Sequence, residues 1–167
     1  MRLLGLDVGD RRIGVALSDP EGRLASPLTT LERGKSGSEF EAILELIRNR
    51  EVGCIVVGLP RSLSGQIGPQ ARKVEKFIEA LSRQTSVPVR TWDERFSTAA
   101  AERALAAAGR RRKELKKRRD AAAAAIILQD YLDQLRLQEQ AREEVSDEKE
   151  GRNFFHPDAA ADHNCLR

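Results

Sequence analysis

The order of hydrophobic patterns along the chain is the feature that most narrows the possible folds. Three short segments with strand-like patterns come first, and helical and strand-like segments then alternate. The predicted strands are residues 2–8, 13–18, 24–31, 54–58 and 87–92. The predicted helices are residues 39–50, 74–81, 98–109 and 120–135. These segments give the order β-β-β-α-β-α-β-α-α.

This order predicts an α/β fold with one mixed sheet. The short turns between the first three strands favour an antiparallel meander, and two right-handed crossovers add two parallel strands and put helices on both faces. The result is a five-stranded sheet with the architecture of the ribonuclease H-like fold. We expect residues 1–138 to form this domain. Residues 139–167 are charged and carry no apolar stripe, so we expect a disordered tail.

Composition restricts the class of protein. Among the 167 residues, 40% are hydrophobic and 33% are charged, which is typical of a globular protein in water. No run of 18 apolar residues occurs, so we expect no membrane span. The two cysteines make no disulfide framework, which predicts a reduced, cytoplasmic protein.

The positive charge is concentrated in one block. Net charge is only +3, yet most of residues 110–119 are Lys or Arg. The basic residues of this block are Arg110, Arg111, Arg112, Lys113, Lys116, Lys117, Arg118 and Arg119. Such a block is typical of a surface that binds the phosphates of a nucleic acid, the alternative being a solvated helix flank. Further candidates for phosphate contacts are Arg11, Arg12, Arg61 and Arg95.

Several carboxylates are expected at one edge of the sheet. Asp7 interrupts the first apolar strand, Asp93 and Glu94 end the fifth strand, and Asp120 begins the last predicted helix. Carboxylates that meet there would repel one another by several kcal/mol, roughly 4 kcal/mol for a pair 4 Å apart. Mg²⁺ or Mn²⁺ removes that cost, because both ions prefer oxygen ligands. The pattern therefore predicts a divalent metal site.

Each acid taken alone has another interpretation. Asp7 could accept backbone hydrogen bonds from its own turn, and Glu94 could pair with Arg95 or cap the next helix. Asp120 could be an acid favoured by the helix macrodipole. Asp93 fits a cap or a supporting position better than a metal ligand. The combination of three acids, rather than any one of them, favours the metal site.

Four stretches resemble the bacterial YqgF/RuvX family. They are GLDVGDRRIGVALSD (5–19), VVGLPRSLSGQIGPQARKVEKFIEAL (56–81), VPVRTWDERFSTAAAE (87–102) and KRRDAAAAAIILQDYL (117–132). The resemblance covers residues 1–138 and implies a ribonuclease H-like fold. It also implies that Asp7, Glu94 and Asp120 are catalytic acids that hold Mg²⁺ or Mn²⁺ for phosphodiester hydrolysis. The family is described both as Holliday junction resolvases and as nucleases that mature the 5′ end of pre-16S ribosomal RNA.

The predicted function is therefore a metal-dependent nuclease that processes the 5′ end of pre-16S ribosomal RNA during ribosome biogenesis. Its partners would be pre-rRNA or branched DNA, and ribosomal precursor particles. One alternative is a resolvase that cuts four-way DNA, and another is a nucleic-acid-binding assembly factor that does not cut. An actin-like ATPase or sugar kinase needs two such domains, and the chain has room for one. Symmetric junction cleavage needs a dimer and RNA cleavage does not, so the sequence is compatible with a monomer or a homodimer.

Overall fold

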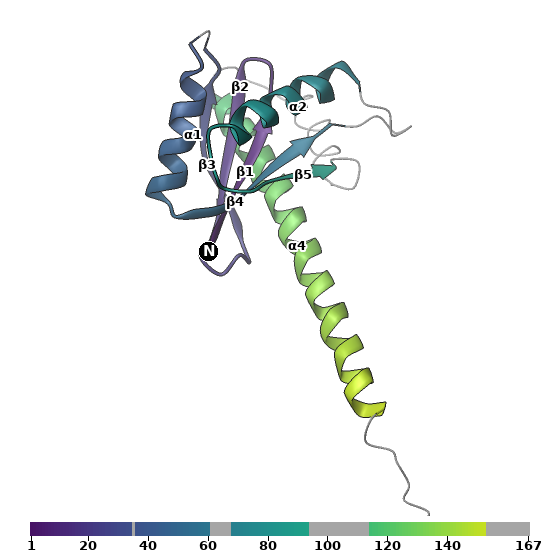
Figure 1. The fold of residues 1–167 in the computed structure, drawn as a ribbon. Helices are drawn as coiled ribbons and strands as arrows, with labels where there is room; N and C mark the ends of the chain where they lie inside the picture. Colours follow the sequence, from purple (N-terminus) through teal and green to yellow (C-terminus); the bar gives the residue numbers. More distant parts are fainter. Residues whose placement is uncertain (35, 61–67, 94–113, 153–167) are drawn as a thin grey trace, which may run out of the picture. The chain divides into compact units, whose positions relative to one another are not determined.

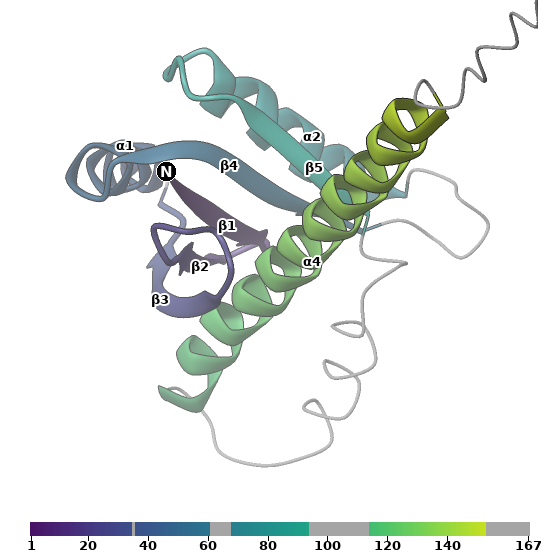
Figure 2. The same ribbon diagram turned by 90° about the horizontal axis from the view of Figure 1, so that it is seen from below.

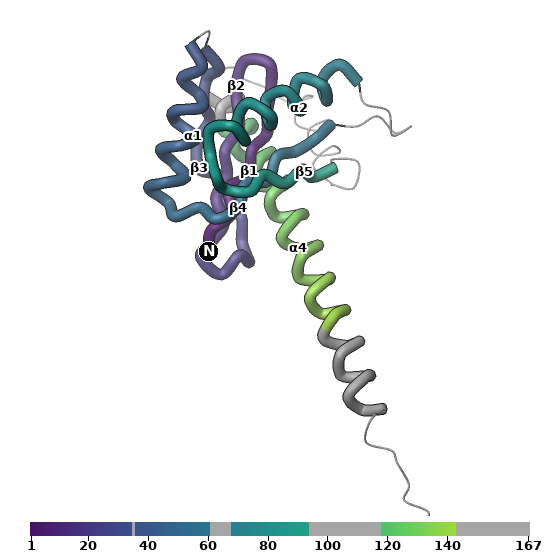
Figure 3. Tube along the Cα trace, in the orientation of Figure 1, coloured from purple at the N-terminus to yellow at the C-terminus, as the bar shows by residue number. Residues whose placement is uncertain are grey.

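The structure is a computed structural model that describes residues 1–34, 36–60, 68–93 and 114–152 (Figures 1 and 3). Within these ranges, residues 114–117 and 143–152 are described by their backbone alone. The predicted helix 98–109 lies outside the described residues. The strands are β1 (Arg2–Val8), β2 (Arg12–Ser18), β3 (Ala25–Glu32), β4 (Val52–Leu59) and β5 (Val89–Asp93). The helices are α1 (Ser38–Asn49), α2 (Pro69–Ser82) and α4 (Glu114–Arg152).

The strands form one mixed sheet in the order β3-β2-β1-β4-β5. β1 pairs antiparallel with β2, and β2 antiparallel with β3. β1 pairs parallel with β4, and β4 parallel with β5. This is the predicted arrangement of a three-stranded meander extended by two parallel strands, so the predicted fold class is confirmed.

Alternate residues of β1 belong to two different cores. Leu4 and Leu6 pack with α1 and α2 in one cluster of buried side chains. Leu3 packs with Leu128 of α4 in a second cluster. The sheet therefore separates α1 and α2 from α4, as Figure 2 shows for α2 and α4 on opposite sides of β4 and β5.

The alanine-rich part of α4 lies unusually close to the sheet. Ala124 is fully buried in the second core. A Cβ atom added at Gly5 would lie 2.7 Å from Leu128 Cβ and 3.0 Å from the backbone oxygen of Ala124. Small residues on both the strand and the helix permit this approach, which explains the run of alanines that begins after Asp120.

Helix α4 is longer than predicted at both ends. It begins at Glu114 rather than residue 120, and it is helical to Arg152, including residues 139–152 where the sequence predicts disorder. The difference has a physical reason: Glu, Gln, Lys and Arg have high helix propensity, while our expectation weighed only the missing apolar stripe. The chain divides into two units, Met1–Asp133 and Gln134–Arg167.

Two further properties of the described residues bear on the predictions. Among them, no helix combines the length and the apolar character that a membrane span requires. Cys54 is a buried free thiol, and burial raises its pKa above the ordinary value of 9.0.

Candidate active site

Asp7 lies at the carboxyl end of β1 on the face that α4 covers. Leu6 and Val8 belong to the core beneath α1 and α2, whereas Leu3 belongs to the core beneath α4. Because strand side chains alternate, Asp7 shares the face of Leu3. It is half-buried and pairs across β1–β2 with Gly14. The acid therefore sits on the middle strand of the sheet, close to the end where the strand turns back.

Gly14 brings α4 to the same place. A Cβ atom at this position would overlap the backbone oxygen of Asp120. The helix backbone at Asp120 thus rests directly on β2, at the residue that pairs with Asp7. The structure thereby brings together two acids, Asp7 and Asp120, that are far apart in the sequence.

Arg12 forms an ion pair with Asp120. Its Nε donates to Asp120 Oδ2 at 2.8 Å, and the two side chains are 21% and 28% exposed. Arg12 starts β2 two residues before Gly14, so it lies on the same face of the sheet. The sequence predicts Arg12 as a phosphate contact; the structure places its guanidinium against a predicted metal ligand.

The position of Asp120 in its helix removes one alternative. The sequence predicts that the helix begins at Asp120, and this prediction is wrong because α4 begins at Glu114. The macrodipole favours acids within the first turn and its effect fades beyond that turn. Asp120 lies more than one turn inside, so a favourable dipole does not account for an acid at this position.

Arg33, which sequence reasoning missed, holds the turn between β1 and β2. Gly9 N–H donates to the Arg12 carbonyl at 2.8 Å and closes the turn. Arg33 Nη1 donates to the Gly9 carbonyl at 2.9 Å, and its backbone N–H donates to the Arg11 carbonyl at 2.9 Å. No periodicity or motif marks Arg33, because its role depends on the end of β3 lying beside this turn.

The register of β5 against β4 places Asp93, the last residue of β5. Asp93 pairs with Leu59, whose side chain lies in the core beneath α1 and α2. Trp92, one residue earlier, packs in the core beneath α4. Alternation therefore assigns Asp93 to the face opposite Asp7. Glu94 lies outside the described residues.

The described acids form only part of the predicted metal site. No group of three His, Cys, Asp or Glu residues able to hold a metal occurs in the part of the chain that the structure describes, and that part excludes Glu94. The backbone of Asp120 does contact Gly14, the partner of Asp7, and carboxylates at these two positions fit the oxygen preference of Mg²⁺ and Mn²⁺.

Two of the predicted basic residues lie beside this site. Arg118 is exposed, and Arg119 is half-buried. Arg118 and Ala121 line a cavity of about 530 Å³ together with Pro27, Leu28, Thr29 and Thr30 of β3. Thr30 pairs with Gly14, so this cavity adjoins the place where α4 crosses β2.

Among the remaining predicted basic residues, Arg11 is the one whose side chain the structure describes. Arg11 is exposed in the turn between β1 and β2. The side chains outside the described set are those of Arg61, Arg95, Arg110, Arg111, Arg112, Lys113, Lys116 and Lys117.

The sheet order, the acid at the end of its middle strand and the acid on the last helix define a ribonuclease H-like domain. A family model described as RuvX, Holliday junction resolvase, matches residues 1–134. The chain therefore belongs to the RuvX family. Membership confirms the prediction of a phosphodiester-hydrolysing enzyme, a nuclease.

Relatives and solved structures agree with this assignment. A protein of Thermoanaerobacter pseudethanolicus named "Putative pre-16S rRNA nuclease" is 49% identical over 105 residues, which are 63% of this chain and 76% of the relative. A protein of Roseiflexus sp. with the same name is 47% identical over 135 residues, 81% of this chain and 96% of the relative. The structure of Thermus thermophilus RuvC matches with a TM-score of 0.50 at 15% identity, covering 79% of this chain and 94% of that one. This last likeness supports the fold alone.

Proposed function

We propose that the chain is a divalent-metal-dependent nuclease that processes the 5′ end of pre-16S ribosomal RNA in the cytoplasm. Its metal ligands and catalytic acids are Asp7, Glu94 and Asp120. The observation that carries the proposal is the contact of α4 with Gly14, which brings Asp120 to the level of Asp7. The proposed substrate, pre-16S ribosomal RNA, is the one in the names of the relatives from Thermoanaerobacter and Roseiflexus.

The proposed carboxylates suit metal-assisted hydrolysis of a phosphodiester bond. A divalent cation bound there supplies an activated water and stabilises the leaving oxygen of a phosphodiester. The role of the chain is to hold carboxylate oxygens at the end of β1 and on α4 in fixed positions. Arg12 offsets the charge of Asp120 and so reduces its repulsion of Asp7. The donor set fits Mg²⁺ and Mn²⁺ and contains none of the softer ligands that favour zinc or copper.

Two features of β4 and β5 support Glu94 as the third ligand. Asp93 pairs with Leu59 and belongs to the face opposite Asp7, so it is poorly placed to share a metal ion with that acid. β4 lies between β1 and β5 in the sheet. Val57 of β4 pairs with Leu6 of β1, so Gly58, the next residue of β4, lies beside Asp7. Because this residue is a glycine, β4 carries no side chain between the end of β1 and the end of β5 at this level.

The surface beside the acids suits a phosphate backbone. The cavity of about 530 Å³ between β3 and α4 is lined by residues of β3, Thr29 and Thr30 among them, and by the exposed Arg118 of α4. Arg11 is exposed in the adjoining turn. We propose that these groups, continued by the basic block, bind the sugar-phosphate backbone, with an affinity that falls as salt rises.

A second candidate substrate is the four-way DNA junction named by the family description. A third candidate, a binding factor that does not cut, is disfavoured by the acids. A protein that only binds phosphates gains nothing from two carboxylates beside its basic surface, because they repel the ligand.

Cleavage by the purified protein in Mg²⁺ or Mn²⁺ tests the proposal. An RNA that spans the 5′ end of pre-16S ribosomal RNA and a four-way DNA junction are incubated side by side with wild type and with Asp7→Asn. We expect cleavage of the RNA that is lost in the variant. Symmetric cleavage of the junction alone would replace the RNA proposal with a resolvase, and would require a dimer. Equal inactivity of both proteins on both substrates would contradict a nuclease function.

A further inference from the structure

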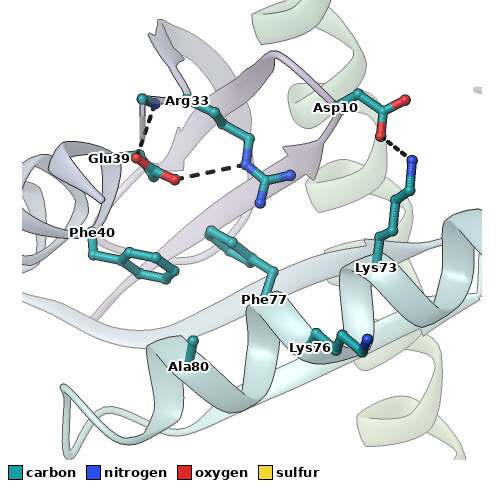
Figure 4. A pocket seen from close by; sticks show the side chains of 9 residues that line it. Asp10, Arg33, Glu39, Phe40, Lys73, Lys76, Phe77 and Ala80 are labelled. Atoms are coloured by element: carbon teal, nitrogen blue, oxygen red, sulfur yellow. Dashed lines mark hydrogen bonds and ion pairs between the residues drawn. The ribbon is translucent and has the colours of Figure 1, made fainter. Parts of the chain in front are cut away.

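A second cavity lies on the other side of the sheet, between α1, α2 and the end of β3 (Figure 4). Its volume is about 550 Å³, within the range of small-ligand sites. Its lining residues are Asp10, Arg33, Gly34, Glu39, Phe40, Lys73, Lys76, Phe77 and Ala80. It contains three cationic side chains and two carboxylates, and none of these residues belongs to the predicted site.

The two lysines of this cavity, Lys73 and Lys76, are not held in strong ion pairs and can bind an anion instead. Lys73 Nζ pairs with Asp10 Oδ1 at 2.7 Å, but these side chains are 57% and 61% exposed, so solvent screens their attraction and the ion pair is weak. This contact lowers the pKa of Asp10 below its ordinary value of 3.8. Lys76 is exposed and has no ion-pair partner among the described residues. Two lysines one turn apart on α2 thus present ammonium groups to an incoming anion.

The floor of the cavity is aromatic. Phe40 of α1 stacks on Phe77 of α2 with ring centroids 5.0 Å apart and 20° between the ring planes. Phe77 is buried, whereas Phe40 is half-buried and lines the cavity. Both phenylalanines that the structure describes are therefore here. An aromatic surface beside cations is the combination that single-stranded nucleic acids bind, with bases stacked on the rings.

Arg33 connects the cavity to the active site. Its guanidinium lies 5.5 Å from the centroid of the Phe77 ring, and its Nε faces buried Glu39 at 3.7 Å. Its Nη1 donates to the Gly9 carbonyl in the turn that follows Asp7. Gly9 is two residues beyond Asp7, about 7 Å along an extended chain. The turn between β1 and β2 therefore lies beside this cavity and directly follows Asp7.

We propose that this cavity binds a nucleotide of the RNA strand that flanks the cleavage point, with its phosphate on Lys73 and Lys76 and its base against Phe40. The inference rests on the proposed nuclease function and adds to it a second contact with the same substrate. The cavity lies on the face of the sheet opposite α4, so the strand passes over the turn between β1 and β2.

Binding of a short single-stranded RNA oligonucleotide, measured in the Asp7→Asn background over a range of salt concentrations, tests the proposal. We expect Lys76→Ala, and more strongly Lys73→Ala/Lys76→Ala, to weaken binding. One lost phosphate contact corresponds to about fivefold at 0.1 M salt, and to a fall of about 0.7 in the salt slope. The matched control is Arg48→Ala/Arg83→Ala, which removes the same charge from exposed positions at the ends of α1 and α2 outside the cavity.

Phe40→Leu provides the second measurement. It removes the aromatic ring while keeping an apolar side chain, so we expect affinity to fall at least fivefold with an unchanged salt slope. Melting of each variant is compared with wild type, so that loss of binding in a folded protein is distinguished from unfolding. Equal affinities for the lysine variants and the arginine control would overturn the cavity proposal alone. Absence of RNA binding by the parent protein would overturn the nuclease proposal with it.

Discussion

Gly14→Ala tests how closely the active site depends on the contact between α4 and the sheet. A Cβ atom at Gly14 would overlap the backbone oxygen of Asp120. A Cβ atom and a backbone oxygen need at least about 3 Å between them, so the helix backbone has to move away by more than about 1 Å. Overpacking of this kind costs about 1–3 kcal/mol of unfolding free energy. For a chain of this size that corresponds to a fall in Tm of roughly 2–12 °C.

The effect on catalysis is expected to exceed the effect on stability. A displacement of about 1 Å at a catalytic group can reduce the rate about 100-fold, and Gly14→Ala displaces Asp120, the proposed catalytic acid on α4. The assay is kcat/KM for cleavage of the pre-16S RNA at a temperature where the variant remains folded. The matched control is Gly5→Ala, which meets Leu128 Cβ at 2.7 Å further along the same helix. We expect comparable destabilisation but a smaller catalytic loss. Equal catalytic losses, or full activity in Gly14→Ala, would refute this reasoning.

Three further predictions concern single side chains. Arg12→Ala removes the cation paired with Asp120, so Mn²⁺ should bind roughly fivefold more tightly, as judged by calorimetry; unchanged affinity would contradict the ion pair. In Cys165→Ser protein, Cys54 should react with a thiol reagent only on unfolding, because it is buried and burial raises its pKa; rapid labelling of the folded protein would contradict this. Hydrogen bonds from the backbone N–H groups of Leu24, which has the largest effect, and Arg23 lower the pKa of Asp19 below its ordinary value of 3.8. Part of the free energy of unfolding should therefore be lost as pH falls below 3.8 toward that lowered pKa. Denaturant unfolding of Asp19→Asn should lack that part of the pH dependence, and an identical pH profile would contradict it.

Most of the fold could be predicted because each strand and helix has a clear hydrophobic period. The strand CIVVG at residues 54–58 is buried on both faces, and its apolar run alone identifies a strand inside an α/β sheet. The start of α4 at Glu114 could not be predicted in this way. Its first turns carry the basic residues of the block, which have high helix propensity but no apolar stripe.

The sequence marks candidate acids but not their surroundings, and the metal-binding role of those acids stays a prediction. A charge inside an apolar strand marks Asp7 on physical grounds. The assignment of Asp93 to the opposite face depends on the register of β5 against β4, which the sequence does not contain. The pairing of Arg12 with Asp120 and the position of Arg33 depend on contacts between distant segments.

Binding of Mn²⁺ by calorimetry, in wild type and in carboxylate variants, tests the central claim most directly. The claim is that Asp7 and Asp120 belong to one metal site and that Asp93 does not. We predict that Asp7→Asn and Asp120→Asn each reduce affinity at least tenfold, whereas Asp93→Asn binds Mn²⁺ like wild type. Equal affinity in all four proteins, or a loss confined to Asp93→Asn, would contradict the account.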